Sequence, residues 1–392
     1  MDTLILQQQL EALEASGMAR FLREIESAQG PRVNINGREV VLLCSNNYLG
    51  FANHPLLVEA SLKATRDLGT GSGASRLVSG SMSLHHQLEE RIATFKGCEA
   101  ALVFNSGYAA NTGILQGLLG PDDVIFSDAL NHASIIDGCR LSPSRTVIYP
   151  HNNWQALEVL MQQESSARKG SWLIVTDGVF SMDGDIAPLK KLCEFKERYD
   201  AWLMVDDAHG TGVLGEGGRG SGEFCDCLDR IDLHMGTLGK ALGGFGAFLA
   251  SRRAVIDTLI NRSRSFIFST SLPPGVLAAG LASFDLVESH EGADRRKQLE
   301  ENRKLFTSTV TAAGIDTLGS PTQIVPLLTR EPDFTMDAAA QLLNQGYFIQ
   351  GIRPPTVPEG MCRLRATLMA DHHPDDISSA ATAVVNLLGA RS

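Results

Sequence analysis

Short apolar runs alternate with longer segments of helical period through the middle of the chain. The apolar runs indicate strands at seven places: Ala100–Phe104, Val124–Phe126, Thr146–Tyr149, Trp172–Thr176, Trp202–Asp206, Asp232–Met235 and Phe245–Ala250. Between them, apolar residues recur at helical spacing, as in Leu157-Glu158-Val159-Leu160 and Leu189-Lys190-Lys191-Leu192. This alternation predicts an α/β fold whose sheet is mostly parallel and doubly wound.

The pattern changes near residue 275. A long charged helix pattern covers His290–Val310, and short strand patterns follow near Gln323–Leu328 and Arg363–Thr367. At the other end, the first 45 residues have helical and then extended character. Because 392 residues exceed one ordinary core, more than one domain is expected. We predict an N-terminal arm over residues 1–45, a large domain over 46–275 and a smaller α+β C-terminal domain over 276–392.

Composition excludes several classes of function. The chain is 43% apolar and 20% charged, as globular proteins are, and its formal net charge is −11. The acids are spread along the chain, so no basic face is available for nucleic acid or an anionic membrane. The N-terminus lacks the pattern of a signal peptide, and no apolar stretch approaches a membrane span. We expect a cytoplasmic protein that captures anionic substrates with local arginines.

Cysteine and histidine spacing does not indicate a metal site. The seven cysteines are scattered, and the close pair Cys225 and Cys227 lacks both zinc-ribbon spacing and a partner pair. Free thiols in a reducing compartment are therefore predicted. His372 and His373 lie among three aspartates, but adjacent histidines on a polar turn are typical of a solvated loop. We expect no metal here.

The strongest chemical signal is a lysine framed by glycines, Lys240 in Gly239-Lys240-Ala241. It lies 34 residues beyond Asp206, which ends an apolar strand pattern. A pyridoxal phosphate (PLP) enzyme needs this pair, an amine to carry the cofactor and a carboxylate to keep the pyridine nitrogen protonated. Ligands of open α/β sheets bind at the carboxyl ends of strands, so His209 would reach the same crevice. These residues predict a PLP site.

Three further motifs could complete that site. Ser106-Gly107-Tyr108 follows a strand and opens a helix, where unpaired N–H groups suit a phosphate, and Thr237 could add a contact. His132 follows the next strand and could stack on a planar ring. Ser181 follows the strand at Trp172–Thr176, where it could contact the cofactor, whereas Asp183 and Gly184 are expected only to form the turn.

Two other motifs fall outside the predicted cofactor site. Gly69–Gly73 superficially resembles a dinucleotide loop, but it follows the helical pattern Val58–Asp67 rather than a strand, so a dinucleotide site is rejected. Its glycines would instead let backbone approach a ligand or another subunit. Arg353 is fixed by Pro354 and Pro355, and an arginine fork held at one angle suits a substrate carboxylate.

The combined motifs resemble the α-oxoamine synthase family of fold-type I PLP enzymes. The matching segments are Ser45–Gly50, Gly71–Arg76, Val179–Asp185, Val205–Gly212, Thr237–Lys240 and Ile352–Pro358. They span nearly the whole chain. The resemblance implies a homodimer with active sites at the interface, which suits the glycine-rich loop at 69–73.

The resemblance also implies a role for each matching residue. Lys240 is implied as the Schiff-base lysine, Asp206 as the partner of the pyridine nitrogen and His132 as the stacking ring; together with His209 they form the implied catalytic set. The other implied contacts are Ser181 and His209 at the ring oxygen, Gly107, Tyr108 and Thr237 at the phosphate, and Asn46, His132, Arg353 and Thr356 at the substrate.

Ala74–Gly80 and Ile352–Thr356 resemble one branch of the family. That branch condenses L-alanine with pimeloyl-CoA or pimeloyl-acyl-carrier protein in biotin biosynthesis, releasing CO2 and the free thiol; the carrier stays open. The N-terminal substrate arginine of this pattern is best matched by Arg20, with Arg23 as the rival. The segment Asn131–Gly138 matches this branch and the alternative branch, a ligase of glycine and acetyl-CoA, equally well. An aminotransferase would use the same lysine and aspartate without acyl transfer.

Overall fold

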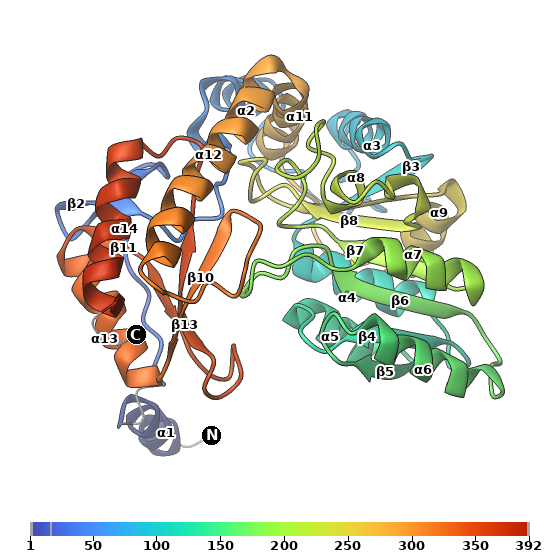
Figure 1. The fold of residues 1–392 in the computed structure, drawn as a ribbon. Helices are drawn as coiled ribbons and strands as arrows, with labels where there is room; N and C mark the ends of the chain where they lie inside the picture. The colour runs from blue at the N-terminus through green and yellow to red at the C-terminus, as the bar shows by residue number, and fades with distance from the viewer. Residues whose placement is uncertain (1–2, 16–17, 390–392) are drawn as a thin grey trace.

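The computed structural model describes residues 3–15 and 18–389, which form a large α/β part and a smaller part beside it (Figure 1). The large part is built on one seven-stranded sheet in the order β3-β9-β8-β7-β6-β4-β5. Its strands are β3 (Ala100–Phe104), β4 (Val124–Asp128), β5 (Arg145–Tyr149), β6 (Trp172–Asp177), β7 (Trp202–Asp206), β8 (Leu233–Thr237) and β9 (Ala247–Ser251). Neighbours among β4 to β8 are parallel, whereas β9 pairs antiparallel with both β3 and β8. The predicted mostly parallel sheet is confirmed.

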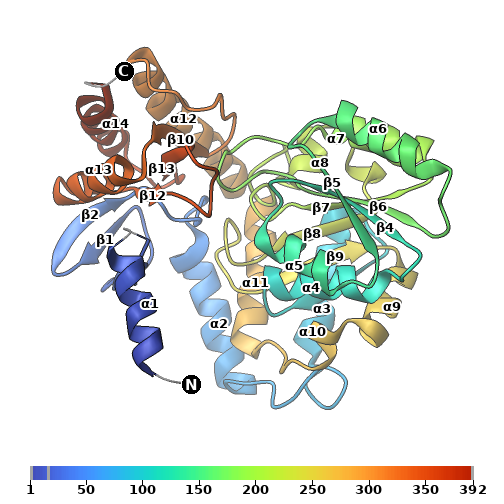
Figure 2. The ribbon, with the colours of Figure 1, turned by 90° about the horizontal axis from the view of Figure 1, so that it is seen from below.

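Helices cover both faces of this sheet (Figure 2). Side chains of a strand alternate between faces, and in β6 Leu173 and Val175 pack with α4 and α5 while Trp172 and Ile174 pack with α6 and α7. The helices of the large part are α3 (Ser83–Lys96), α4 (Gly107–Leu118), α5 (Ala133–Leu141), α6 (Trp154–Ser165), α7 (Leu189–Arg198), α8 (Ser221–Phe224), α9 (Arg253–Arg262) and α10 (Arg264–Ile267), with the 3-10 turn η2 (Leu228–Arg230). Burial on both faces explains the near-continuous apolar strands.

The smaller part contains two three-stranded sheets. The strands β10 (Ile324–Arg330), β13 (Cys362–Thr367) and β12 (Gln350–Ile352) form one antiparallel sheet, and α12 (His290–Ala312), α13 (Pro332–Asn344) and α14 (Pro374–Leu388) pack beside it. The second sheet contains β1 (Arg32–Ile35), β2 (Arg38–Leu42) and β11 (Tyr347–Phe348). Asn36 and Gly37, both with positive φ, make the hairpin turn between β1 and β2. The second half of the predicted arm is thus a sheet element that pairs with β11 near the C-terminus.

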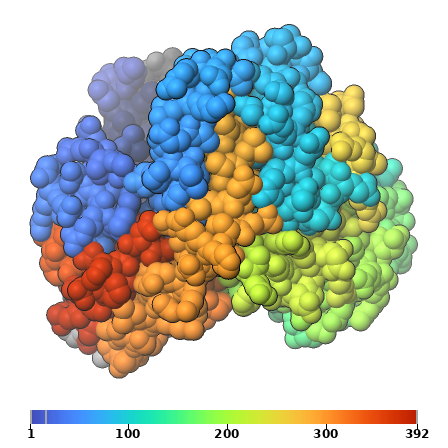
Figure 3. Space-filling model, turned by 90° about the horizontal axis from the view of Figure 1, so that it is seen from above, coloured from blue at the N-terminus to red at the C-terminus, as the bar shows by residue number. Residues whose placement is uncertain are grey.

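Two long helices join the parts. The helix α2 (Pro55–Leu68), after the turn η1 (Phe51–Asn53), packs along α11 (Pro274–Glu288), and Figure 3 shows the two side by side. One buried cluster includes Leu57 of α2, Leu238 of the large part, Phe284 of α11 and Leu364 of β13. Because this core is continuous across both parts, the boundary near residue 275 stays a prediction. The helix α1 (Thr3–Ala15) stands apart and has no buried residue.

The structure also bears on the expectations about compartment and metals. Among the described residues, no helix has both the length and the apolar character needed to cross a membrane, and no three potential metal ligands cluster. All seven cysteines are free thiols, as predicted. The interpretation of His372 as part of a solvated loop was wrong: its ring is buried, its Nδ1 accepts from the Met369 N–H at 3.0 Å, and its Nε2 lies 3.0 Å from the carbonyl of Leu42.

Candidate active site

Four polar residues stand at the same edge of the large sheet. Asp128, Asp177, Asp206 and Thr237 are the last residues of β4, β6, β7 and β8, and Asp177 is paired in register with Asp206. Because these strands are parallel, their carboxyl ends meet in one crevice. The crevice is therefore lined by buried carboxylates.

A cavity of about 210 Å³ occupies this crevice. It is lined by Gly107, Tyr108, His132, Ser134, Asp177, Ser181, Asp206, Ala208, His209, Met235, Thr237 and Lys240. All the residues predicted to contact the cofactor are in this set. The structure thus brings together five separate segments of the chain, although the role of each residue stays a prediction.

Asp206 is buried and held by two donors. The N–H of Ala208 donates to Oδ1 at 3.0 Å, and the side-chain amide of Asn111 donates to Oδ2 at 2.6 Å. The same Asn111 amide donates to the Ser134 hydroxyl at 2.9 Å. These contacts fix the carboxylate in one orientation. Sequence reasoning missed Asn111 because it lies inside the apolar pattern of α4.

Lys240 lies in the loop after β8, with its Nζ 2.9 Å from Nε2 of His209. Burial lowers the pKa of the lysine, the charges of Asp206 and Asp177 oppose this, and the net result is a pKa of about 8. About a tenth of the lysine is therefore neutral at pH 7, far more than for an ordinary lysine, and a neutral amine is a nucleophile and a base.

His209 has a fixed tautomer. The hydroxyl of Tyr48 lies 3.0 Å from Oδ1 of Asn46, which only accepts, and 2.6 Å from Nδ1 of His209. With its one hydrogen given to Asn46, the hydroxyl accepts from Nδ1–H, so Nε2 is the acceptor facing Lys240. Burial, followed by the charge of Lys240, lowers the pKa of His209 well below its usual value, and the ring is neutral. Asn46 is therefore linked to His209 through Tyr48, a residue that sequence reasoning missed.

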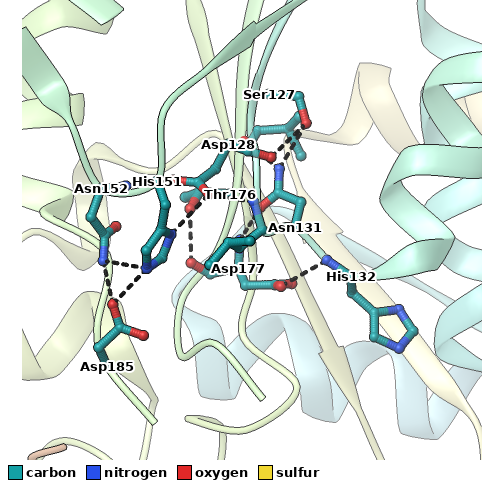
Figure 4. A network of polar contacts seen from close by, with 11 residues as sticks. Ser127, Asp128, Asn131, His132, His151, Asn152, Thr176, Asp177 and Asp185 are labelled. Atoms are coloured by element: carbon teal, nitrogen blue, oxygen red, sulfur yellow. Dashed lines mark hydrogen bonds and ion pairs between the residues drawn. The ribbon is translucent and has the colours of Figure 1, made fainter. Parts of the chain in front are cut away.

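His132 caps the N-terminus of α5. Its Nδ1 accepts from the Ser134 N–H at 3.2 Å and lies 2.7 Å from the Ser134 hydroxyl. The backbone N–H of His132 donates to Asp177 Oδ2 at 2.9 Å (Figure 4). Burial lowers the pKa of the His132 imidazole, and this effect outweighs the charge of Asp206, which would raise it. The ring is thus neutral and fixed beside the cavity. Asp177 was missed, although it ends a strand as Asp206 does.

The N-terminus of α4 forms another wall of the cavity. Ser106 caps this helix, its hydroxyl accepting from the Ala109 N–H at 3.1 Å. The backbone of Gly107 lies so near Thr237 that a Cβ would be 3.1 Å from its Cγ2 atom. The side-chain hydroxyl of Tyr108 donates to Asp137. Tyr108 therefore contributes its backbone, and not its hydroxyl, to the N-terminus of α4. This end of the cavity offers N–H groups to an anion.

The smaller part closes the site with two buried arginines of β13. Arg365 donates from Nε to the Ser181 carbonyl and from Nη2 to Asn46 Oδ1 at 3.4 Å. Arg363 forms an ion pair with Asp183, so the expectation that Asp183 only forms a turn was wrong. Sequence reasoning missed both arginines because alternation along a strand does not reveal which loop a side chain meets.

The other predicted substrate residues lie elsewhere. Arg20, Arg23, Arg353 and Thr356 line a second cavity of about 940 Å³, between the segment after α1 and the region around β12. Arg353 donates to the carbonyl of Ala19 at 2.9 Å, and the guanidinium of Arg23 lies 5.6 Å from the centroid of the Phe348 ring. None of the four lines the first cavity. Their roles stay predictions.

Comparison with known proteins gives matches over nearly the whole chain. The family model for aminotransferase class I and II matches residues 38–384. The 8-amino-7-oxononanoate synthase of Geobacter sulfurreducens is 59% identical over 379 residues, 97% of this chain and 96% of the relative. That of Geotalea daltonii is 58% identical over 380 residues, with the same coverage of 97% and 96%.

A solved structure adds a cofactor to the comparison. Serine palmitoyltransferase from S. paucimobilis, with bound PLP and myriocin, has a TM-score of 0.90 and 30% sequence identity, covering 98% of this chain and 96% of its own. The chain belongs to the aminotransferase class I and II family and, within it, to the group of 8-amino-7-oxononanoate synthases.

Proposed function

We propose that this chain condenses L-alanine with a pimeloyl thioester, releasing CO2 and free thiol, to give 8-amino-7-oxononanoate in biotin biosynthesis. The observation that carries the proposal is the meeting of Lys240, Asp206, His132 and His209 in one cavity at the strand ends. The synthases matched above support this substrate pair rather than glycine and acetyl-CoA. The cofactor is PLP, as in the serine palmitoyltransferase neighbour.

The donors of the first cavity fit PLP. Lys240 offers an amine to the aldehyde, and Asp206 offers a fixed carboxylate to the pyridine nitrogen. The N-terminus of α4 at Gly107, with Thr237 beside it, suits the phosphate. His132 offers a ring face, and His209 and Ser181 offer groups to the ring oxygen. Every polar part of the cofactor would therefore meet a complementary group.

Bound PLP accepts the electron pair left when a bond to the alpha carbon of alanine breaks. The protein supplies position and protons. Lys240 would hold the cofactor, and its amine, when alanine has taken that place, would be the base that removes the alpha proton. Asp206, held by Asn111 and the Ala208 N–H, favours a proton on the ring nitrogen by its charge. Arg365, which links the Ser181 and Asn46 loops, positions both loops at the cavity.

The second cavity is the place for the acyl chain. We infer that Arg20 binds the terminal carboxylate of the pimeloyl group, while Arg353 and Thr356 line the path of the substrate. Arg23 is the weaker alternative because its guanidinium already lies over Phe348. Binding of the remote chain would hold the thioester for attack. Coenzyme A and an acyl-carrier protein both remain possible carriers.

We also infer a homodimer in the cytoplasm. Leu77 and Val78, just after the glycine-rich loop, are 54% and 80% exposed, and Phe268 is 70% exposed. Apolar side chains gathered on such loops are typical of a subunit interface. The seven free thiols fit a reducing compartment. Light scattering on the purified protein would give twice the mass of one chain; a monomer would contradict the dimer.

A substrate-pair assay tests the activity. Alanine with a pimeloyl thioester should give the highest kcat/KM among the four pairings of alanine or glycine with pimeloyl or acetyl thioester. The preference for alanine should be limited, since one methyl group is worth about 1–3 kcal/mol. Arg20→Ala should raise KM for the pimeloyl donor by about tenfold or more, and Arg23→Ala should raise it less.

Two results would contradict these assignments. A higher kcat/KM for glycine with acetyl-CoA would establish the ligase reaction instead. A larger effect of Arg23→Ala than of Arg20→Ala would move the carboxylate contact to Arg23 and leave the reaction unchanged.

A further inference from the structure

His151, in the loop after β5, lies between the carboxylate of Asp128 at the end of β4 and that of Asp185 in the loop after β6 (Figure 4). Its Nδ1 is 3.0 Å from Asp128 Oδ1, and its Nε2 is 2.9 Å from Asp185 Oδ2. Asn152 repeats the link, donating from its backbone N–H to Asp128 Oδ2 at 2.8 Å and from its side-chain amide to Asp185 Oδ2 at 2.6 Å. The ring also packs edge-on against Phe180, with centroids 4.4 Å apart and planes at 85°.

With both carboxylates ionised, the two short contacts of the ring call for a protonated imidazole, although the side-chain amide of Asn152 also lies 3.4 Å from Nε2. An ionised carboxylate only accepts hydrogen bonds, so both ring nitrogens must donate, and only the imidazolium has two N–H groups. A neutral ring would place a lone pair against one of the carboxylates. Burial lowers the pKa of His151, but the hydrogen bonds and charges of Asp128 and Asp185 outweigh it and raise the pKa to about 10. The Asp128 side chain is 1% exposed and that of Asp185 is 30% exposed, so at least one of the two carboxylates is shielded from water.

Both loops lead from this point to the cofactor cavity. The loop after β4 runs from Asp128 to His132, and Asn131 within it donates to the Val175 carbonyl of β6 at 2.9 Å. The loop after β6 is closed by the N–H of Phe180, which donates to the Asp185 carbonyl at 3.0 Å, and Ser181 lies between these two residues. His132 and Ser181 line the same cavity. His151 connects the two loops because its ring binds both Asp128 and Asp185.

We propose that His151 is a positioning residue for PLP: as an imidazolium it binds Asp128 and Asp185 together and so fixes the loops that present His132 and Ser181 to the cofactor. We call these three residues the carboxylate clamp. The inference rests on the PLP site proposed above. It assigns a role in the cofactor site to a residue that does not touch the cavity.

The first experiment observes the charge state of His151 directly. Nuclear magnetic resonance spectra are recorded on protein labelled with nitrogen-15 at histidine. The imidazole signals that are present in the wild type and absent in His151→Gln belong to His151. In the wild type at pH 8.5 they should show two protonated nitrogens. Neutral signals from His151 would overturn the clamp, whatever the protein binds.

The second experiment measures cofactor affinity without any turnover. We expect His151→Gln to weaken the Kd for PLP, followed by cofactor absorbance, on the order of tenfold, as loss of a supporting contact does at other bound groups. His290→Gln is the matched control and should bind as the wild type does. If His151→Gln does not fold, Asp185→Asn, which removes one arm of the clamp, takes its place. Unchanged affinity in the folded variant would overturn the positioning role, whereas a wild type that binds no PLP would overturn the proposed function instead.

Discussion

At the scale of single residues, Lys240 shows how the site prepares its own nucleophile. Its pKa falls from 10.5 to about 8 because burial outweighs the attraction of Asp206 and Asp177. Arg365 adds to the lowering by its positive charge. A lysine on the surface would stay protonated near neutral pH. The position of this amine, rather than its residue type, therefore makes it reactive.

This lowering predicts a pH dependence of cofactor loading. Only the neutral amine attacks an aldehyde, so the rate of PLP capture by apo protein should rise as pH increases through about 8 and then level off. Borohydride reduction followed by peptide mapping should place the label on Lys240. Lys240→Ala should fold, take no label and lose at least about a thousandfold in kcat.

The exposed Lys297 provides the control for this experiment. Lys297→Ala should load PLP and turn over as the wild type does, because its Nζ reaches only a solvated glutamate, Glu301. A label on another lysine, such as the buried Lys96, would contradict the assignment of Lys240.

At the scale of elements, the start of α4 matters because its backbone must come close to the cofactor phosphate. Gly107→Ala would put a Cβ 3.1 Å from Cγ2 of Thr237 and 3.2 Å from the terminal methyl of Met235. These neighbours must move, and we expect the Kd for PLP to rise on the order of tenfold, from a crowding cost of about 1–3 kcal/mol. Equilibrium titration of PLP against the apo variant measures it.

Gly120→Ala, in the loop that follows the same helix, is the matched control. Its added Cβ would meet only Asp123 Oδ2 at 3.6 Å, an ordinary contact, so PLP affinity should not change. Equal affinity for PLP in Gly107→Ala and Gly120→Ala would show that the cofactor phosphate does not bind at the N-terminus of α4.

At the scale of the whole molecule, a buried ion pair ties the outer helix α3 to the strand end that carries the site. The ammonium of Lys96 lies 3.4 Å from Asp207 Oδ2 and donates to the Thr211 hydroxyl at 3.0 Å and to the Arg219 carbonyl at 2.6 Å. Both charged side chains are almost fully buried. Asp207 follows Asp206 directly, so the pair braces the loop that also carries His209.

We expect Lys96→Met to lower the free energy of unfolding by about 3–5 kcal/mol, because it leaves Asp207 buried without its counter-charge. Denaturant titration followed by circular dichroism measures this change. Lys63→Met, which breaks an exposed pair with Asp67, should cost less than about 0.5 kcal/mol. Similar losses in the two variants would show that the buried pair adds nothing to stability beyond an exposed one.

The sequence by itself determined the elements of the large sheet and the chemistry at its strand ends. All seven predicted strands exist, with ends shifted by a few residues at most. The signal was local: buried parallel strands are apolar throughout, and a polar residue directly after such a run marks the edge where ligands bind. Lys240, Asp206 and His209 could be found because each stands at or shortly after the end of a strand, and Asp177 could have been found by the same criterion.

Only the tertiary structure decided which distant residues meet that edge. Arg365 reaches the Ser181 loop from β13, and His151 joins two loops through carboxylates on either side of it. The pairing of β2 with β11 likewise joins opposite ends of the chain. Such contacts depend on how separate segments pack, and a buried arginine or histidine looks in the sequence like an exposed one. Periodicity records which face of an element is buried, but not which partner buries it.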